Sequence, residues 1–328
     1  MAENEAIQVN NLSKKYGDEV QALDGISFGV EEGTVFGLLG PNGAGKSTTV
    51  KILTTLSTPT SGSATVMGHD VLTQGAEVRA KIGVVAQSST ADREATAREN
   101  LRLQGQLYRM KGKELEARIE YLLANFNLAG DGDRIVRGFS GGMERRLTIA
   151  MALVHKPKVL FLDEPTTGLD PEVRSEMWGE ISTLAGDEGM TILLTTHYLE
   201  EADNLAANLA IVDQGRIVAE GTPEELKKGL KGDAIQVGLG ETRTDAEVTA
   251  ALANVTGVSE IILNGRTLHA RSEDGARSVP AVLQSLESAG IAADSVTVSR
   301  PSLDDVYLRY AGRTMEQAEK NEIEEVAA

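Results

Sequence analysis

One short segment restricts the fold more than any other part of this 328-residue sequence. Residues 40–48 read GPNGAGKST and follow an unbroken apolar run, Val35–Leu39, that is typical of a buried strand. They satisfy the pattern G-x-x-x-x-G-K-[ST], in which glycines let backbone N–H groups turn around phosphate oxygens at the start of a helix. A strand, a loop and a helix in this order predict an α/β fold with a phosphate-binding site.

The side chains of this loop have separate expected roles. The ammonium group of Lys46 can reach the β- and γ-phosphates of a nucleotide, and the hydroxyl of Ser47 can bind Mg²⁺. The strand before the loop and the helix after it disfavour the alternative of a plain glycine turn. The residues expected to bind the nucleotide here are Gly40, Pro41, Asn42, Gly43, Ala44, Gly45, Lys46, Ser47 and Thr48.

A second motif ends another apolar strand with two carboxylates. Residues 159–165 read VLFLDEP, and an aspartate at the carboxyl end of a buried strand lies where open α/β sheets bind ligands. Asp163 is expected to hold Mg²⁺ through water, and Glu164 to orient and deprotonate an attacking water. Alone, the motif could be an acidic strand end. Together with the phosphate loop it indicates a nucleotide hydrolase.

The rest of the chain up to residue 230 alternates apolar runs with amphipathic stretches. Ile82–Val85, Ile192–Leu194 and Leu209–Val212 predict further buried strands of a sheet that is covered on both faces. Between about residues 99 and 126 the apolar spacing becomes helical, which predicts a helical insert. The net charge of −17 argues against nucleic-acid binding, and the absence of cysteine excludes disulfides and thiolate metal sites.

A third motif narrows the class of hydrolase. FSGGM, residues 139–143, opens a helix shortly before the second carboxylate motif. Out of context Ser-Gly-Gly would be an N-cap with a flexible turn. Because this motif follows the phosphate loop and precedes the carboxylate motif, the chain resembles the ATP-binding cassette (ABC) ATPases over residues 6–228. The resemblance implies that Ser140, Gly141 and Gly142 close over ATP held by the opposite subunit of a homodimer.

The remaining family elements follow in order. The resemblance implies that Tyr16 stacks on adenine, that Gln87 senses Mg²⁺ and the attacking water, that Asp170 touches the other subunit, and that His197 contacts the γ-phosphate. A single tyrosine or histidine more often has a structural role. Only the position of Tyr16 and His197 among the other family motifs indicates a functional one. The implied catalytic residues are Glu164, His197 and Gln87, and the implied Mg²⁺ ligands are Ser47, Gln87 and Asp163.

The signature motif departs from the commonest family form at two positions. It begins with Phe139 and ends with Met143, where leucine and glutamine are usual. Phenylalanine keeps an apolar anchor. Methionine removes a polar side chain near the partner's nucleotide but leaves Ser140, Gly141 and Gly142 for the anion.

A second domain is expected after the cassette. We place the cassette at residues 1–230, with a helical subdomain at about 88–155, and a small α+β domain at 231–312. Its order is β-α-β-β-α-β, with a hairpin at Asn264-Gly265, and this order predicts a ferredoxin-like fold. The acidic residues 313–328 are expected to be a disordered tail. A dimerisation or regulatory role is expected for the second domain.

The branch of the family is indicated by three features together. SGGMERRL, the α+β extension and the closing PSLDDVYLRYAG (301–312) look like the daunorubicin-resistance type of ABC export ATPase. The resemblance implies an ATP-hydrolysing subunit that powers efflux, of a drug, antibiotic, lipid or similar compound, through a separate membrane permease, and that works as a homodimer without nucleic acid. Neither a signal-peptide pattern nor a membrane-spanning run is visible, so we expect a cytoplasmic protein held peripherally at the inner face of the membrane.

Two other functions remain open. An importer ATPase shares the motifs, but sugar-importer cassettes carry an all-β extension, whereas this extension is α/β in pattern. A soluble ABC protein acting on ribosomes or DNA usually has two cassettes or a long coiled coil. This chain has one phosphate loop, no long heptad array and a net charge of −17.

Overall fold

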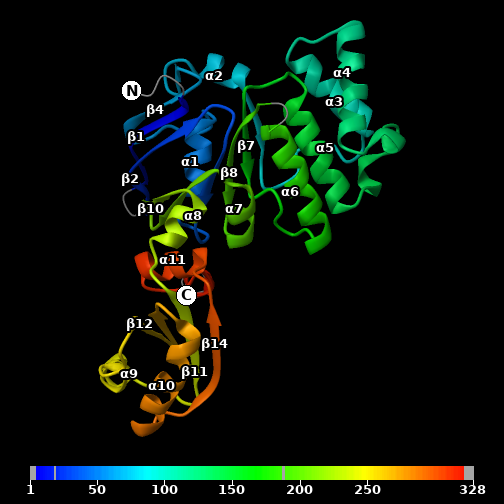
Figure 1. Ribbon diagram of the computed structural model, residues 1–328. Helices are drawn as coiled ribbons and strands as arrows, with labels where there is room; N and C mark the ends of the chain where they lie inside the picture. The colour runs from blue at the N-terminus through cyan, green and yellow to red at the C-terminus, as the bar shows by residue number, and fades with distance from the viewer. Residues whose placement is uncertain (1–4, 18–19, 187–188, 321–328) are drawn as a thin grey trace. The chain divides into compact units, whose positions relative to one another are not determined.

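The computed structural model describes residues 5–17, 20–186 and 189–320, and the chain divides into two compact units, Met1–Glu220 and Gly221–Ala328 (Figure 1). We call these the first unit and the second unit. The division lies before the boundary expected at residue 230. Helix α8 (Pro223–Lys228) belongs to the second unit because it packs against α11 (Leu303–Ala311), where Arg309 donates a hydrogen bond to the carbonyl of Gly229.

A largely parallel sheet forms the centre of the first unit. Its strands lie in the order β10-β9-β3-β8-β7-β6, and the pairs from β9 to β6 are parallel. Nearly all residues of the inner strands are buried, as the unbroken apolar runs predicted. The strands are β3 (Val35–Leu39), β6 (Ile82–Val85), β7 (Val159–Asp163), β8 (Thr191–Thr196), β9 (Asn208–Asp213) and β10 (Arg216–Gly221).

An antiparallel sheet lies beside it and was not predicted from the sequence. Its order is β2-β1-β4-β5, and its long strands alternate buried and exposed residues, a weaker signal than an apolar run. The strands are β1 (Glu5–Tyr16), β2 (Val20–Glu31), β4 (Ser61–Val66) and β5 (His69–Asp70). Helices α1 (Lys46–Leu53), α2 (Gly75–Lys81), α6 (Pro171–Gly186) and α7 (Leu199–Leu205) complete this part of the first unit.

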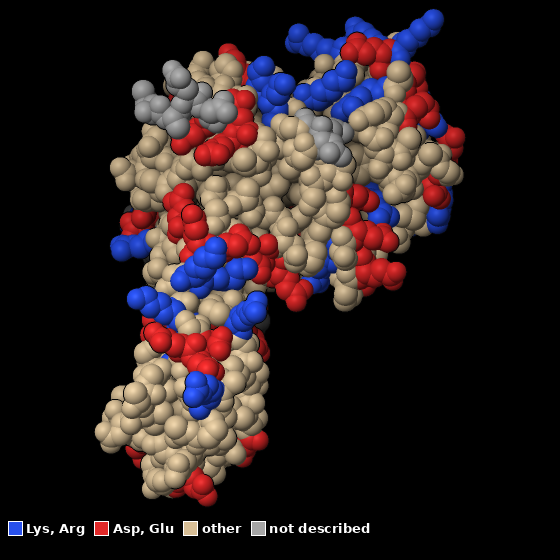
Figure 2. Space-filling view, viewed as in Figure 1, with Lys and Arg blue, Asp and Glu red and all other residues tan. Residues whose placement is uncertain are grey.

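The expected helical insert consists of α3 (Ala97–Leu107), α4 (Gly112–Asn125) and α5 (Gly141–Leu153). Leu101, Leu115 and Ile119 share a buried core with Leu147 of α5. Leu103 and Leu107 of α3 lie outside this core and are 57% and 70% exposed. Figure 2 shows charged side chains of both signs over α3 and α4.

The second unit has the ferredoxin-like arrangement that the element order predicted. Its antiparallel sheet has the order β12-β13-β11-β14, and α9 and α10 share an apolar core with one face of it. The elements are β11 (Asp233–Leu239), α9 (Asp245–Leu252), β12 (Val258–Asn264), β13 (Thr267–Ser272), α10 (Gly275–Ser288) and β14 (Ala293–Ser299).

The prediction of a disordered tail from residue 313 is wrong for residues 315–320. Residues 315–320 are helical, Met315 and Ala318 are buried, and the Met315 amide donates to Asp304 Oδ1 at 3.3 Å. The apolar residues within the acidic stretch explain this, since they cover part of the second unit. Residues 321–328 lie outside the described residues. Every helix in the described ranges is too short or too polar to cross a membrane.

The core of the first unit gives a stability prediction. Phe161 on β7 is fully buried, so Phe161→Ala should lower the free energy of unfolding of this unit by about 3–5 kcal/mol. Urea unfolding followed by the fluorescence of Trp178, the chain's single tryptophan, measures it. The exposed Leu56→Ala is the matched control and should change stability by less than about 0.5 kcal/mol. Equal effects of the two variants would contradict the packing described here.

Candidate functional site

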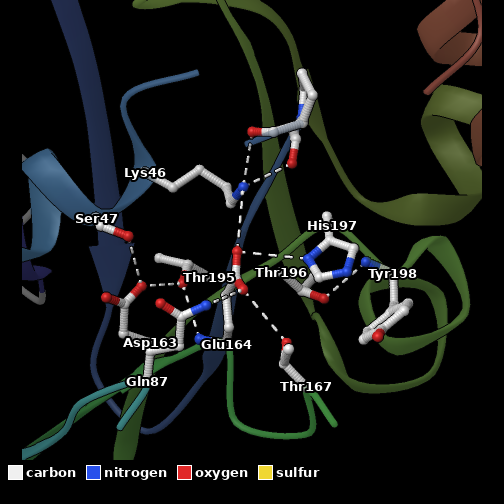
Figure 3. A network of polar contacts seen from close by, with 12 residues as sticks. Lys46, Ser47, Gln87, Asp163, Glu164, Thr167, Thr195, Thr196, His197 and Tyr198 are labelled. Carbon is white, nitrogen blue, oxygen red and sulfur yellow. Dashed lines mark hydrogen bonds and ion pairs between the residues drawn. The ribbon is translucent and has the colours of Figure 1, made fainter. Parts of the chain in front are cut away.

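The phosphate loop joins β3 to α1, and its lysine points into the loop (Figure 3). Lys46 Nζ donates hydrogen bonds to the carbonyl oxygens of Gly40 and Pro41 at 2.7 and 2.8 Å, and the side chain is almost fully buried. The N-cap of α1, Gly45, offers no side-chain acceptor to the first amides of the helix, and its first turn carries no acidic residue. These amides and the Lys46 ammonium together favour an anion.

Two glycines of the loop are required by its geometry. Gly45 has φ +109°, and a Cβ there would lie 2.6 Å from the carbonyl oxygen of Ala22. A Cβ on Gly40 would lie 2.2 Å from the carbonyl oxygen of Val212. Because both neighbours are backbone atoms that cannot move independently, a larger residue at either position would deform the loop.

Asp163 collects two hydroxyl groups from neighbouring elements. Its Oδ1 accepts hydrogen bonds from Ser47 Oγ at 3.1 Å and from Thr195 Oγ1 at 2.6 Å. Ser47 starts α1, Asp163 ends β7, and Thr195 lies on β8, which separates β7 from β3 in the sheet. The expected pair Ser47 and Asp163 is therefore brought into direct contact.

Glu164 is the centre of the polar network in Figure 3. Its Oε2 accepts from Gln87 Nε2 at 3.1 Å and from Thr167 Oγ1 at 3.3 Å. Its Oε1 lies 3.6 Å from Lys46 Nζ and 3.4 Å from His197 Nδ1. The backbone of Glu164 has φ +49°, which is uncommon for a side-chain-bearing residue and concentrates at functional sites. The structure thus gathers Lys46, Gln87, Glu164 and His197 at one point.

The surroundings of Glu164 favour its ionised form. The contact with His197 is the largest cause that lowers the pKa of the carboxyl, and the charge of Lys46 adds to it. Burial acts in the opposite direction but does not prevail, so the pKa lies below its ordinary value. The group is consequently a carboxylate at neutral pH and can accept a proton.

The signature segment begins α5 and supplies a second helix N-terminus. Ser140 caps this helix and accepts from the Met143 amide at 3.3 Å. A Cβ on Gly142 would lie 2.7 Å from Val173 of α6, whereas a Cβ on the exposed Gly141 would meet only Leu169 at 3.7 Å. Gly142 thus serves close helix packing, and Gly141 leaves the helix end open to a ligand.

The two unusual signature residues both pack against the helical insert. Phe139 is buried in the core of the insert, beneath the guanidinium of Arg134 at 5.8 Å from the ring centre, and so keeps the expected apolar anchor. Met143 is partly buried against the same core.

Two further expected site residues, Asp170 and Tyr16, make local contacts of their own. Asp170 is exposed and caps α6 by accepting from the Val173 amide at 3.0 Å. Tyr16 is 42% exposed at the end of β1, with Lys14 Nζ 4.8 Å from its ring centre. Its register partner Val20 lies two residues from Ala22, which touches the phosphate loop.

Sequence reasoning missed two residues that hold the site together. The residue type of Thr195 alone does not indicate a role. Its hydroxyl nevertheless donates a hydrogen bond to Asp163 and accepts one from the Glu164 amide at 3.1 Å. Arg145 of α5 is buried and donates to the carbonyls of Ala86 at 2.6 Å and Asp163 at 3.3 Å. Burial lowers its pKa to about 10. The position of Thr195, two residues before His197, was the available signal for the first.

Comparison with known proteins identifies the family of the chain. Residues 23–167 match the ABC transporter family, and residues 221–311 match the C-terminal domain of DrrA1-3-like ATP-binding proteins. The chain is 46% identical over 307 residues to the daunorubicin resistance ATP-binding protein DrrA3 of Streptomyces coeruleorubidus, covering 94% of this chain and 96% of that protein. The chain belongs to the ABC ATPase family. It is an ATPase, and ATP is the nucleotide of its family.

Other relatives and solved structures extend the comparison. The Nod factor export ATP-binding protein I of Sinorhizobium fredii is 42% identical over 311 residues, covering 94% of this chain and 87% of that protein. CbiO1 of Clostridium perfringens, part of an ABC transporter complex, superimposes with a TM-score of 0.64 at 29% identity, over 68% of this chain and 91% of that one. A cassette solved as a dimer with ADP and Pi gives a TM-score of 0.60 at 27% identity, over 66% and 98% of the two chains.

The depressed pKa of Glu164 predicts a pH dependence of stability. When folding lowers the pKa of a carboxyl, the ionised group stabilises the folded protein at pH values above its pKa in the unfolded chain. This stabilisation is lost as the pH falls through its pKa in the folded protein. Glu164→Gln lacks this titration. Its stability deficit relative to the natural protein should therefore shrink as the pH falls below about 4.5, the ordinary pKa of a glutamate carboxyl, measured by urea unfolding. The exposed Glu172→Gln is the control, and a deficit that stays constant or grows in acid would contradict the assignment.

Proposed function

We propose that this chain is the ATP-hydrolysing subunit of an ABC exporter, which powers efflux through a separate membrane permease. The observation that carries the proposal is the convergence of the Lys46 ammonium, the Ser47–Asp163 pair and the Glu164 carboxylate at the ends of β3 and β7. The names of the relatives, which describe drug resistance and Nod factor export, favour export over import as the direction of transport.

The proposed hydrolysis uses groups already in place. Lys46 and the open amides of α1 hold the phosphates. Glu164 accepts a proton from a water that attacks the γ-phosphorus, the bond to the bridging oxygen breaks, and ADP and phosphate leave. His197 and Gln87, in contact with the two oxygens of Glu164, orient this carboxylate and face the γ-phosphate and the water.

The donor set beside the loop fits Mg²⁺. Ser47 Oγ and Asp163 Oδ1 are hard oxygen donors in mutual contact, and Gln87 donates a hydrogen bond to Glu164, the residue after Asp163. Within the described residues, no group of three or more His, Cys, Asp or Glu side chains could hold a metal ion unaided. The ion would therefore take its other ligands from phosphate and water, where it neutralises developing charge.

The proposed active site is completed by a second copy of the chain. Ser140 and Asp170 each accept a hydrogen bond from a backbone amide in the first turn of the helix that follows them. The open N-terminus of α5 at Gly141 is suited to a γ-phosphate bound by another chain. We therefore infer that ATP joins two chains, each signature segment closing over the nucleotide of the other.

This mechanism predicts an ATP-dependent dimer of one variant. Glu164→Gln keeps Lys46, Ser47 and Asp163, so it should bind ATP, but it should lose at least about a hundredfold in hydrolysis because an amide cannot accept the proton. With ATP and Mg²⁺ it should accumulate as a dimer in light scattering. Adding Gly141→Asp should abolish that dimer, since a carboxylate would face the γ-phosphate. Equal dimerisation with ADP, or an unchanged dimer of the double variant, would contradict the shared site.

A groove in the first unit is the proposed docking site for the permease. It has a volume of about 220 Å³ and lies between β6, α2, α3 and α5. Gly83 and Val84 of β6 line it a few residues before Gln87, and Tyr108 stacks on His155 at its wall with ring centres 3.6 Å apart. The exposed Leu103 and Leu107 are next in sequence to the lining residues Gln104 and Tyr108. An apolar permease helix seated here could pass its movement to Gln87 along β6.

Leu107→Asp tests this docking site. It should reduce co-purification of the permease and transport at least about tenfold, because a charge would enter an apolar contact, while ATP binding by the isolated chain stays unchanged. Tyr310→Asp places the same charge at an exposed aromatic position of the second unit and should leave permease binding intact. If only Tyr310→Asp breaks the complex, the permease docks on the second unit. The proposed location at the inner face of the membrane rests on the same complex.

A further inference from the structure

One edge of the sheet in the second unit is open. β14 pairs with β11 on one side, and within the described residues no strand pairs with its other side. All seven residues of β14 are exposed, including Val296 at 39% and Val298 at 37%. The register of β14 with β11 has one irregularity at the start of the strand, between Ala293 and Ser295. It then runs regularly from Ser295 to Ser299, a stretch without proline or lysine. These are the devices by which proteins commonly protect an edge strand.

The opposite edge of the same sheet is protected. β12 has an irregular register between Ser259 and Ile262, and Glu260 within it has φ +50°. The Glu260 carboxylate binds two guanidinium groups, of Arg271 and Arg309, each at 3.3 Å. A bulge of this kind bends a strand and blocks continued pairing. The sheet therefore has one edge closed to addition of a strand and one edge open.

The open edge has a self-complementary sequence. From Asp294 to Arg300 the chain reads Asp-Ser-Val-Thr-Val-Ser-Arg, which is symmetric about Thr297 except for the charges at its ends. In an antiparallel pair of two such strands centred on Thr297, the central threonines face each other. Each serine faces a serine, each valine faces a valine, and Asp294 faces Arg300 of the other strand.

We propose that a second copy of this chain pairs with the first through β14, in the register that places Thr297 on the twofold axis. A twofold interface requires that the same surface be complementary to itself, which this palindrome satisfies. Because β12 is blocked, the pairing ends after two copies. It yields a closed dimer with one sheet continuous across both chains, rather than a fibre.

The two faces of the added pair suit their surroundings. Val296 and Val298 are opposite Val237 and Ile235 of β11, whose side chains lie in the core beneath α9 and α10. In the dimer each valine pair would extend this core and cover apolar surface that is now half-exposed. Thr297 and the serines lie on the other face, where hydroxyl pairs across strands are favourable. Figure 2 shows mostly uncharged residues in the region of β14.

The charged ends favour one register. Asp294 already pairs with Arg266 of its own chain at 3.2 Å, while Arg300 is exposed and faces the carboxylate end of the other strand in this arrangement. A shift by two residues would leave one facing valine pair in place of two and separate Asp294 from Arg300. The contact involves no nucleotide, so it goes beyond the ATP-dependent dimer proposed above. It would keep two cassettes at high effective concentration throughout the ATP cycle.

Single cysteines test the register because the natural chain has none. Facing residues of an antiparallel pair have Cα atoms roughly 4.5–5.5 Å apart, within disulfide range. Full-length Thr297→Cys, freed of nucleotide and mildly oxidised, should therefore form a linked dimer. Ser259→Cys on the blocked edge is the matched exposed control. The linked dimer of Thr297→Cys should form at least about tenfold faster.

A pair of neighbouring variants makes the test specific. Ser295→Cys alone should not link, because its own copy would lie four residues away, roughly 13 Å along the strand. An equal mixture of Ser295→Cys and Ser299→Cys should link, since these residues face each other. Thr297→Lys, without cysteine, should raise the dissociation constant of the nucleotide-free dimer at least about tenfold in sedimentation, because two ammonium groups meet on the axis.

Three results would overturn the proposal. They are linkage of Thr297→Cys no faster than Ser259→Cys, linkage of Ser295→Cys alone as fast as the mixture, and linkage of Thr297→Cys to the permease instead of to itself in membranes. The ATP-dependent dimer of Glu164→Gln is measured separately, in a chain without cysteine. The two dimers can therefore fail independently.

Discussion

The proposed catalytic arrangement depends on the parallel register of β3, β8 and β7. Leu39 at the end of β3 pairs with Thr196, and Asp163 at the end of β7 pairs with Thr195. β8 therefore delivers a hydroxyl to Asp163 and an imidazole to Glu164 from between the two strands that carry the phosphate loop and the carboxylates. A shift of one residue in either pairing would separate these groups, because successive side chains of a strand point to opposite faces.

The buried charges at this junction stabilise one another. Lys46 and Glu164 are both almost fully buried, and an isolated charge in such a place would be costly. Each is instead surrounded by partners: two carbonyl oxygens for Lys46, and an amide, a hydroxyl and an imidazole for Glu164. A buried ammonium group thus lies at the phosphate loop of a chain whose net charge is −17. The overall charge describes the surface and places no limit on a phosphate site.

In both units, backbone hydrogen-bonding groups at the boundary of an element are available to a ligand or to another chain. In the first unit, helix N-termini with few internal acceptors, at Gly45 and Gly141, leave backbone donors for a ligand. In the second unit, β14 leaves strand donors and acceptors for another strand. Backbone groups at helix ends and at a strand edge are thus the common basis of the proposed nucleotide contacts and the proposed sheet extension.

The sequence by itself determined the class of fold and most of the site. GPNGAGKST after Val35–Leu39, and VLFLDEP at the end of an apolar run, required strand ends at a common edge, since parallel strands place their carboxyl ends together. The β-α-β-β-α-β order and the Asn264-Gly265 turn likewise determined the second unit. Local patterns suffice wherever burial on both faces or a tight turn leaves one solution.

Only the tertiary structure decided the rest, because the decisive contacts join distant residues. The roles of Thr195 and Arg145, the exposure of Leu103 and Leu107, and the ordered start of the tail depend on which elements pack together. The antiparallel sheet of the first unit was not predicted from the sequence, because its strands alternate buried and exposed residues and so lack an unbroken apolar run. The open edge of β14 is a property of strand order: the palindrome is visible in the sequence, but only the order β12-β13-β11-β14 leaves it unpaired.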